Sequence, residues 1–222
     1  MKSEELFREI EEDLRRDRMN RLWQRYGGIV AGAALLIVVG TAGKVFWDHR
    51  QAELHAAEAQ RFTSAQSLLA SGKQAEAADA FAALAADGDT GFAELARLRE
   101  AEARAAAGDQ AGAGSALAEL QGQASDPVLR DLATLMQAER QLADGDPAEL
   151  RKLLEPLAAP EAPWRNQARE LLALVAIRAG DLDEARKLLS DLTQEAGVIP
   201  SQQRRAAELL EAIGGAPPQA SS

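Results

Sequence analysis

The chain has 222 residues, a formal net charge of −10 and no cysteine. The missing cysteines exclude disulfides and thiolate metal sites, and the acidic balance argues against nucleic acid as a partner, because nucleic acid is itself a polyanion. Alanine and leucine dominate while aromatic residues make up 4%, which favours helices over strands along the whole chain.

Residues 1–25 are predicted to form an amphipathic cytoplasmic segment. Leu6, Ile10 and Leu14 lie at approximate helical spacing, and acidic residues crowd the first half while arginines crowd the second. Such a helix lies on a membrane surface, contacts a partner, or stands solvated beside the membrane. The sequence leaves these three alternatives open.

Residues 26–47 are predicted to form a transmembrane signal anchor. The stretch from Tyr26 to Gly43 contains no charged residue, and as a helix it would span about 27 Å, close to the roughly 30 Å thickness of a bilayer's hydrocarbon core. Tyr26 at one end and Phe46 and Trp47 at the other suit the two membrane–water interfaces.

The charges around this segment predict its orientation. Six arginines precede it closely and fewer basic residues follow it, so the N-terminus should stay cytoplasmic and residues from 48 onward should cross into the periplasm. Gly40 and Ala42 have the spacing of a signal-peptide cleavage site. The long, acid-containing start of the chain and the length of the apolar run instead favour an uncleaved anchor.

Beyond the anchor the sequence repeats at intervals of 35 to 37 residues. Glycines that mark turns recur at Gly72, Gly108, Gly145 and Gly180. Apolar residues follow each glycine at offsets of five, nine and twelve, which places them on one face of a helix, and an alanine precedes each glycine by seven. Glycine adopts the left-handed conformation that ends a helix. The pattern predicts stacked helix–turn–helix units.

We expect four helical hairpins and a final capping helix, at residues 50–88, 91–124, 127–159, 163–195 and 201–213. Together they form a predicted helical repeat domain over residues 48–213. Glycine, proline and serine dominate residues 214–222, which are therefore expected to be a disordered tail.

Residues that could carry chemistry are scarce. His49 and His55 are six positions apart, which places them about 240° apart around a helix and prevents them from sharing a metal. No glycine-rich phosphate loop follows a strand. We therefore expect no catalytic residue, no cofactor and no metal, and keep an enzyme with a hidden pocket as an alternative.

Trp164 is the one candidate site residue. It is the only aromatic residue after Phe92. A lone tryptophan on a repeat surface either anchors a protein partner, as interface hot spots do, or packs between neighbouring repeats.

The repeats resemble the tetratricopeptide repeat, in which a turn glycine is followed by a small residue and then a large apolar one, as at Gly180, Ala185 and Leu189. That family's tryptophan and tyrosine of the first helix are missing here, and its closing proline is displaced. The resemblance implies an all-α protein, with a single transmembrane helix followed by a tetratricopeptide-like α-solenoid of hairpins.

The whole chain resembles the single-pass inner-membrane proteins that act as ancillary subunits of the Sec translocon. The stretch 11–28, EEDLRRDRMNRLWQRYGG, carries this resemblance as it leads into the anchor and the alanine-rich repeats. It implies a bacterial inner-membrane protein that binds the translocon channel and a membrane-anchored periplasmic chaperone and assists exported clients. The alternative is an envelope scaffold for cell division or cell-wall synthesis. We expect no nucleic-acid partner and no small-molecule substrate.

Overall fold

The computed structural model describes residues 2–87 and 91–215, and in the N-terminal part it gives the solvent exposure of Gly28, of Gly32 and of the residues from Leu35 onward. The described residues form helices and connecting turns without strands, as the composition predicts. The chain divides into two compact units, Met1–Ala57 and Glu58–Ser222.

Helix α1 (Lys2–Ala70) contains the predicted cytoplasmic segment and the predicted anchor. In the described part of the chain, no helix combines the length and the apolar character that crossing a membrane requires. The side chains of residues 1–27, 29–31 and 33–34 lie outside the described residues. The amphipathic character of 1–25 and the anchor at 26–47 stay predictions from the sequence.

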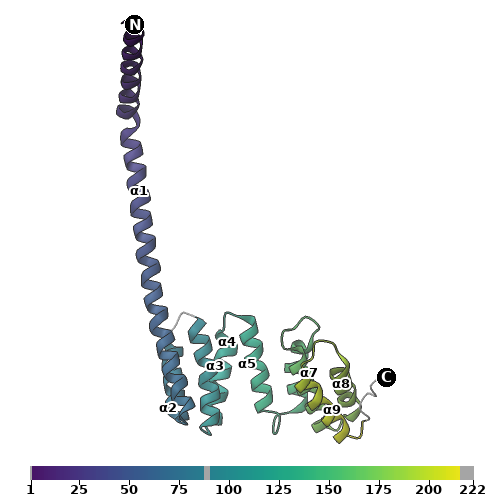
Figure 1. Ribbon diagram of the computed structural model, residues 1–222. Helices are drawn as coiled ribbons and strands as arrows, with labels where there is room; N and C mark the ends of the chain where they lie inside the picture. The colour runs from purple at the N-terminus through teal and green to yellow at the C-terminus, as the bar shows by residue number, and fades with distance from the viewer. Residues whose placement is uncertain (1, 88–90, 216–222) are drawn as a thin grey trace. The chain divides into compact units, whose positions relative to one another are not determined.

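The second unit is a stack of antiparallel helices in which neighbours in sequence are neighbours in space. Hairpin 1 pairs the end of α1 with α2 (Gln74–Asp87). Hairpin 2 is α3 (Gly91–Ala106) with α4 (Gln110–Gln123), hairpin 3 is α5 (Pro127–Arg140) with α6 (Pro147–Leu154), and hairpin 4 is α7 (Arg165–Ala179) with α8 (Leu182–Gln194). A last helix, α9 (Pro200–Ala212), follows them. Helix α6 continues as the 3₁₀ helix η1 (Glu155–Ala158). The bounds of α2 to α8 agree with the four predicted hairpins to within a few residues, whereas α1 runs without a break through residue 50, where the first hairpin is predicted to begin (Figure 1).

Three of the four predicted turn glycines have the left-handed backbone. Gly72, Gly108 and Gly180 have φ angles of 78°, 86° and 80°, and each lies at the end of the first helix of a hairpin. The prediction is wrong for Gly145, which does not have a positive φ. Helix α5 already ends at Arg140, and the turn after it brings the Gln141 carbonyl within 2.7 Å of the position that a Cβ on residue 145 would occupy.

The predicted apolar stripe is the core of the repeats. At the offsets of five, nine and twelve, every residue of the four second helices is buried: Ala77, Phe81, Leu84, Ala113, Leu117, Leu120, Leu150, Leu154, Leu157, Ala185, Leu189 and Leu192. The alanines seven residues before each glycine are at most 2% exposed. A small side chain there lets the two helices of a hairpin approach closely, as predicted.

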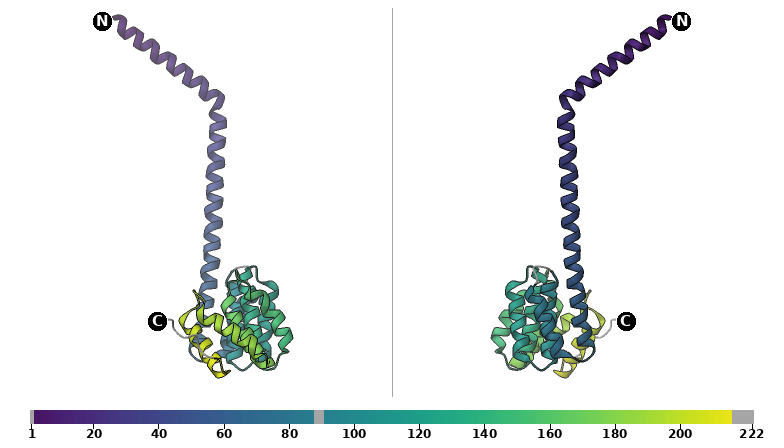
Figure 2. Two further views of the ribbon diagram at one scale, coloured as in Figure 1. Left: turned by 90° about the vertical axis from the view of Figure 1, so that its right-hand side faces the viewer. Right: turned by 90° about the vertical axis from the view of Figure 1, so that its left-hand side faces the viewer.

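Helix α9 closes the stack. Its Ala206 and Leu210, with Val198 just before it, pack on Leu189 and Leu192 of α8. The side chains of Arg204, Glu208 and Glu211 are exposed, so α9 gives the last hairpin an apolar cover and leaves a polar outer face. Figure 2 shows the stack from its two ends, with α8 and α9 (yellow-green) toward the reader on the left and α2 (blue) on the right.

Candidate protein-interaction surface

Trp164 stands at the N-cap position of α7 and is half-buried. Its ring packs against the cluster of leucines that joins α5, α6 and α7, and its indole Nε1 donates a hydrogen bond to the Val128 carbonyl at 3.0 Å. The structure therefore gives the indole a packing role between hairpins 3 and 4. Its role toward a partner stays a prediction.

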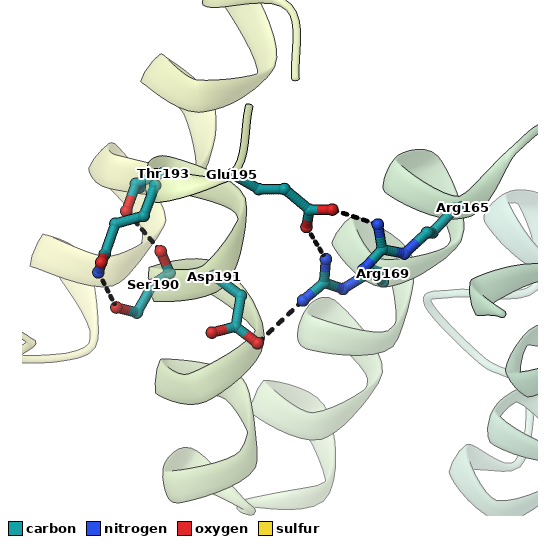
Figure 3. A network of polar contacts seen from close by, with 7 residues as sticks. Arg165, Arg169, Ser190, Asp191, Thr193 and Glu195 are labelled. Atoms are coloured by element: carbon teal, nitrogen blue, oxygen red, sulfur yellow. Dashed lines mark hydrogen bonds and ion pairs between the residues drawn. The ribbon is translucent and has the colours of Figure 1, made fainter. Parts of the chain in front are cut away.

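Hairpin 4 contains a partly buried ion-pair network, drawn in Figure 3, that joins the first turns of α7 to the C-terminal end of α8. Glu195 accepts hydrogen bonds from Arg165 on one carboxylate oxygen and from Arg169 on the other. Arg169 also donates to Asp191 at 2.9 Å. The Arg169 residue is 8% exposed, whereas the side chains of Glu195 and Asp191 are 27% and 48% exposed, so a largely buried guanidinium neutralises two carboxylates that are partly in contact with water. These four residues are called the Arg169 network below.

The electrostatics of the Arg169 network favour the ionised carboxylate. Partial burial raises the pKa of Glu195, but hydrogen bonds from Arg169 and Arg165 outweigh that effect and hold the pKa below the ordinary glutamate value. The carboxylate therefore stays charged at neutral pH and keeps both arginines in place.

Hairpin 2 repeats part of this arrangement 72 residues earlier in the chain, the distance from Gly108 to Gly180. Arg97 stands where hairpin 4 has Arg169. It donates to the Gln123 side chain at 2.5 Å, lies 3.6 Å from a Glu119 oxygen, and reaches the Ala85 carbonyl at 3.4 Å. Its Nε is buried and has no hydrogen-bond partner among the described residues.

A cleft of about 380 Å³ opens beside Arg97. The C-terminal ends of α2 and α4 and the first turns of α3 form its walls. Small side chains, among them Ala85, Ala93 and Ala124, leave the space open, and Glu94 and Arg97 are the charged residues that line it. The cleft is thus a concave part of the described repeat surface with two charged residues in its lining.

Glu94 is held in an ionised, oriented state in this cleft. Its Oε1 accepts hydrogen bonds from the Ser125 backbone N–H at 2.6 Å and from the Ser125 hydroxyl at 2.7 Å. These two bonds, the backbone one foremost, lower the pKa of Glu94, with Arg130 adding a weaker long-range attraction. A charged carboxylate at the mouth of a small-walled cleft suits a cationic or hydrogen-bond-donating ligand.

Sequence reasoning missed both Glu94 and Arg97, because isolated charges on an amphipathic helix are usually solvated. The signal that could have found Arg97 is the recurrence of an arginine at positions 97 and 169, in register with the repeat, whereas Glu94 has no such signal because its counterpart is Asn166. Among the residues that the structure describes, no group of three or more possible ligands could hold a metal ion.

The comparisons with known proteins give one match. A family model for the tetratricopeptide repeat-like domain matches residues 20–197, which is most of the chain. Searches of curated proteins and of solved structures gave no match.

Proposed function

Because the chain belongs to the tetratricopeptide repeat-like domain family, we propose that it is a membrane-anchored binding protein of the bacterial envelope, with its repeats in the periplasm. Domains of this family mediate protein–protein interactions, and the fold is typically a non-catalytic scaffold. The finer proposal is an ancillary subunit of the Sec translocon that assists exported proteins together with a membrane-anchored periplasmic chaperone.

One observation carries the anchoring part of the proposal. Leu35 to Val39 are five consecutive aliphatic residues of α1, each between 60% and 75% exposed. Successive helix residues are about 100° apart, so these five side chains cover every face of the helix. Leaving one such side chain in water instead of burying it costs about 1.5–3 kcal/mol, and lipid would cover all five at once.

The flanking residues support the same reading. Phe46 and Trp47 are 70% and 67% exposed on α1, and Lys44 and Asp48, which form an ion pair, lie on either side of them in the sequence. Exposed aromatic rings next to the first charged residues are typical of a membrane–water interface. The arginines before residue 26 support a cytoplasmic N-terminus for the proposed anchor, by the positive-inside rule.

The repeat domain supports the binding part of the proposal. It has a concave, charged cleft in hairpin 2. A tether to the membrane would hold this cleft near the export channel, so that high local concentration compensates for weak contacts with passing clients.

Extraction of membranes at alkaline pH tests the anchor. We expect the wild-type chain to stay with the membrane pellet. Replacing Leu36 and Ile37 by arginine should release it, because a charged side chain at the centre of a span costs several kcal/mol. A wild-type chain that partitions with soluble proteins would contradict the anchor.

Photo-crosslinking in intact membranes tests the partner. A photoreactive residue at exposed Asp79 of α2 should give adducts with the translocon channel or with a periplasmic chaperone. The same photoreactive residue at exposed Arg204 of α9 is the control that shows whether the adducts depend on the position of the probe. Recovery of lipid-linked and self-linked products alone would contradict a translocon role. Adducts with division or wall-synthesis proteins would favour the scaffold alternative.

A further inference from the structure

The internal repeat of the chain shows what the hairpin 2 cleft lacks. A shift of 72 residues superimposes hairpin 2 on hairpin 4 in sequence. Both second helices begin at an aspartate N-cap, Asp109 and Asp181, whose side chain accepts from a backbone N–H three residues on. The alanines at 101 and 173 are both buried. The two hairpins can therefore be compared position by position.

The comparison locates a missing guanidinium. Position 93 in hairpin 2 is alanine, whereas the equivalent position in hairpin 4 is Arg165. Arg165 reaches the C-terminal end of α8 and pairs with Glu195. Ala93 has no such side chain, and it lines the cleft. Position 85 is also smaller than its counterpart, alanine in place of Leu157, so the space stays open.

The charged residues of the two hairpins also differ. In the Arg169 network two guanidiniums face two carboxylates (Figure 3). At the equivalent positions of hairpin 2, Arg97 faces Glu119, while Ala93 and Gln123 replace the second guanidinium and the second carboxylate. Glu94, whose counterpart in hairpin 4 is the neutral Asn166, adds a carboxylate to the cleft that hairpin 4 lacks at this position. Arg130 of α5 makes no ion pair with Glu94 among the described residues, and its effect on that carboxylate is weaker than the bonds from Ser125.

We propose that the hairpin 2 cleft binds an arginine side chain of a protein partner, in the place that Arg165 takes within hairpin 4. The incoming guanidinium would pair with Glu94, which Ser125 already orients, and would lie beside Ala93 and Ala124. This inference names the chemistry of the partner and rests on the proposed protein-binding function. Arginine is preferred over lysine because its planar fork can pair with a carboxylate through two parallel hydrogen bonds.

Binding of blocked tripeptides to the full chain in detergent micelles tests the proposal. Acetyl-Ala-Arg-Ala-amide should give saturable NMR shifts at the backbone amides of Ala93, Glu94 and Ala124. The lysine and citrulline tripeptides should bind at least about fivefold more weakly, since citrulline has the shape of arginine without its charge. Glu94→Gln should weaken arginine binding about tenfold, the ratio that corresponds to one charge-assisted hydrogen bond.

The Glu94→Gln substitution also changes the contact of Glu94 with Ser125. Two further variants therefore test the cleft without changing Glu94. Ala93→Arg should fill the cleft from within and abolish peptide binding, and Ala106→Arg, at the exposed far end of α3, adds the same charge without filling it and should bind normally. Adding Gln123→Glu to Ala93→Arg should rebuild the arrangement of hairpin 4 and raise the melting temperature by about 3 °C.

Equal binding of the arginine, lysine and citrulline peptides, or undiminished binding by Ala93→Arg, would overturn the proposal. Such a result would leave the crosslinking of the full chain to its partners unaffected. Conversely, arginine-selective binding without translocon or chaperone adducts would sink the translocon role alone.

Discussion

The indole Nε1 of Trp164 donates a hydrogen bond to the carbonyl oxygen of Val128, 3.0 Å away and 36 residues earlier in the chain. At the opposite end of α7, Arg178 donates to the carbonyl oxygen of Leu142, also 36 residues earlier. The separation is within one residue of the 35-residue interval from Gly145 to Gly180, so residues at nearly equivalent places in successive hairpins join α7 to α5 and the turn after it. Phe92, one further repeat back from Val128, contacts Phe62 of α1 with ring centroids 6.0 Å apart.

Replacing Trp164 by phenylalanine should destabilise the repeat domain by about 1 kcal/mol, because the ring keeps most of its packing while the Val128 carbonyl loses its donor. The measurement is the thermal midpoint of the purified chain, which should fall by about 3 °C. Trp47→Phe, in the exposed part of α1, is the matched control and should leave the midpoint unchanged. Identical midpoints for both variants would show that the indole N–H adds no stability.

Replacing Arg169 by alanine should cost about 2 kcal/mol, since it removes charge-assisted hydrogen bonds to Glu195 and Asp191 from a largely buried site. The urea midpoint should fall while the slope stays constant. Arg204→Ala is the control, because Arg204 is an exposed arginine of α9 without an ion pair in the described part of the chain. Equal midpoints for the two variants would contradict the role assigned to the Arg169 network.

Stability should fall in acid through Glu195 and Glu94. The pKa of each is lower in the folded chain than the ordinary glutamate value of 4.5. Their contribution is therefore fully present above about pH 4.5 and is lost as the pH falls through the lower folded-state pKa. Chemical unfolding at a series of pH values measures this loss, and Glu195→Gln should flatten the profile. A variant with the same acid dependence as the wild type would refute the assignment to Glu195.

Three glycine-to-alanine variants should show which glycines the fold requires and why. Gly180→Ala should cost about 1 kcal/mol because its φ of 80° strains an L-residue. Gly145→Ala should cost about 2 kcal/mol because its Cβ would meet the Gln141 carbonyl at 2.7 Å. Gly122→Ala meets nothing within 4 Å in α4 and should stabilise by about 0.5 kcal/mol. Thermal unfolding ranks the three, and any other order would contradict these contacts.

The hairpins and their core could be predicted from the sequence because the repeat period supplies the same information several times. Leu117 and Leu189, for example, occupy the same offset from their glycines and are both buried. The prediction is wrong for Gly145 because a turn can require glycine for lack of space around Cβ as well as for a positive φ. Sequence spacing alone does not separate the two.

The candidate site could not be predicted in the same way. The ion pairs of Arg97 and Arg169 depend on which residues lie near the end of the following helix. Whether those residues come within reach of the guanidinium is decided by distances in the folded chain, which the repeat period does not give. The cleft depends on what is missing at Ala93. The absence of a large side chain becomes informative only when hairpin 4 shows Arg165 at the same place.

Hairpin 3 has Thr134 where the core register of its neighbours places an arginine, and among the described residues the Thr134 hydroxyl donates to the Arg130 carbonyl and accepts from the Gln121 side-chain amide. Its second helix is also short, eight residues before the 3₁₀ turn. When the molecule is stretched between its ends in optical tweezers, hairpin 3 should therefore unfold first. The hairpins before it and after it should unfold at higher force.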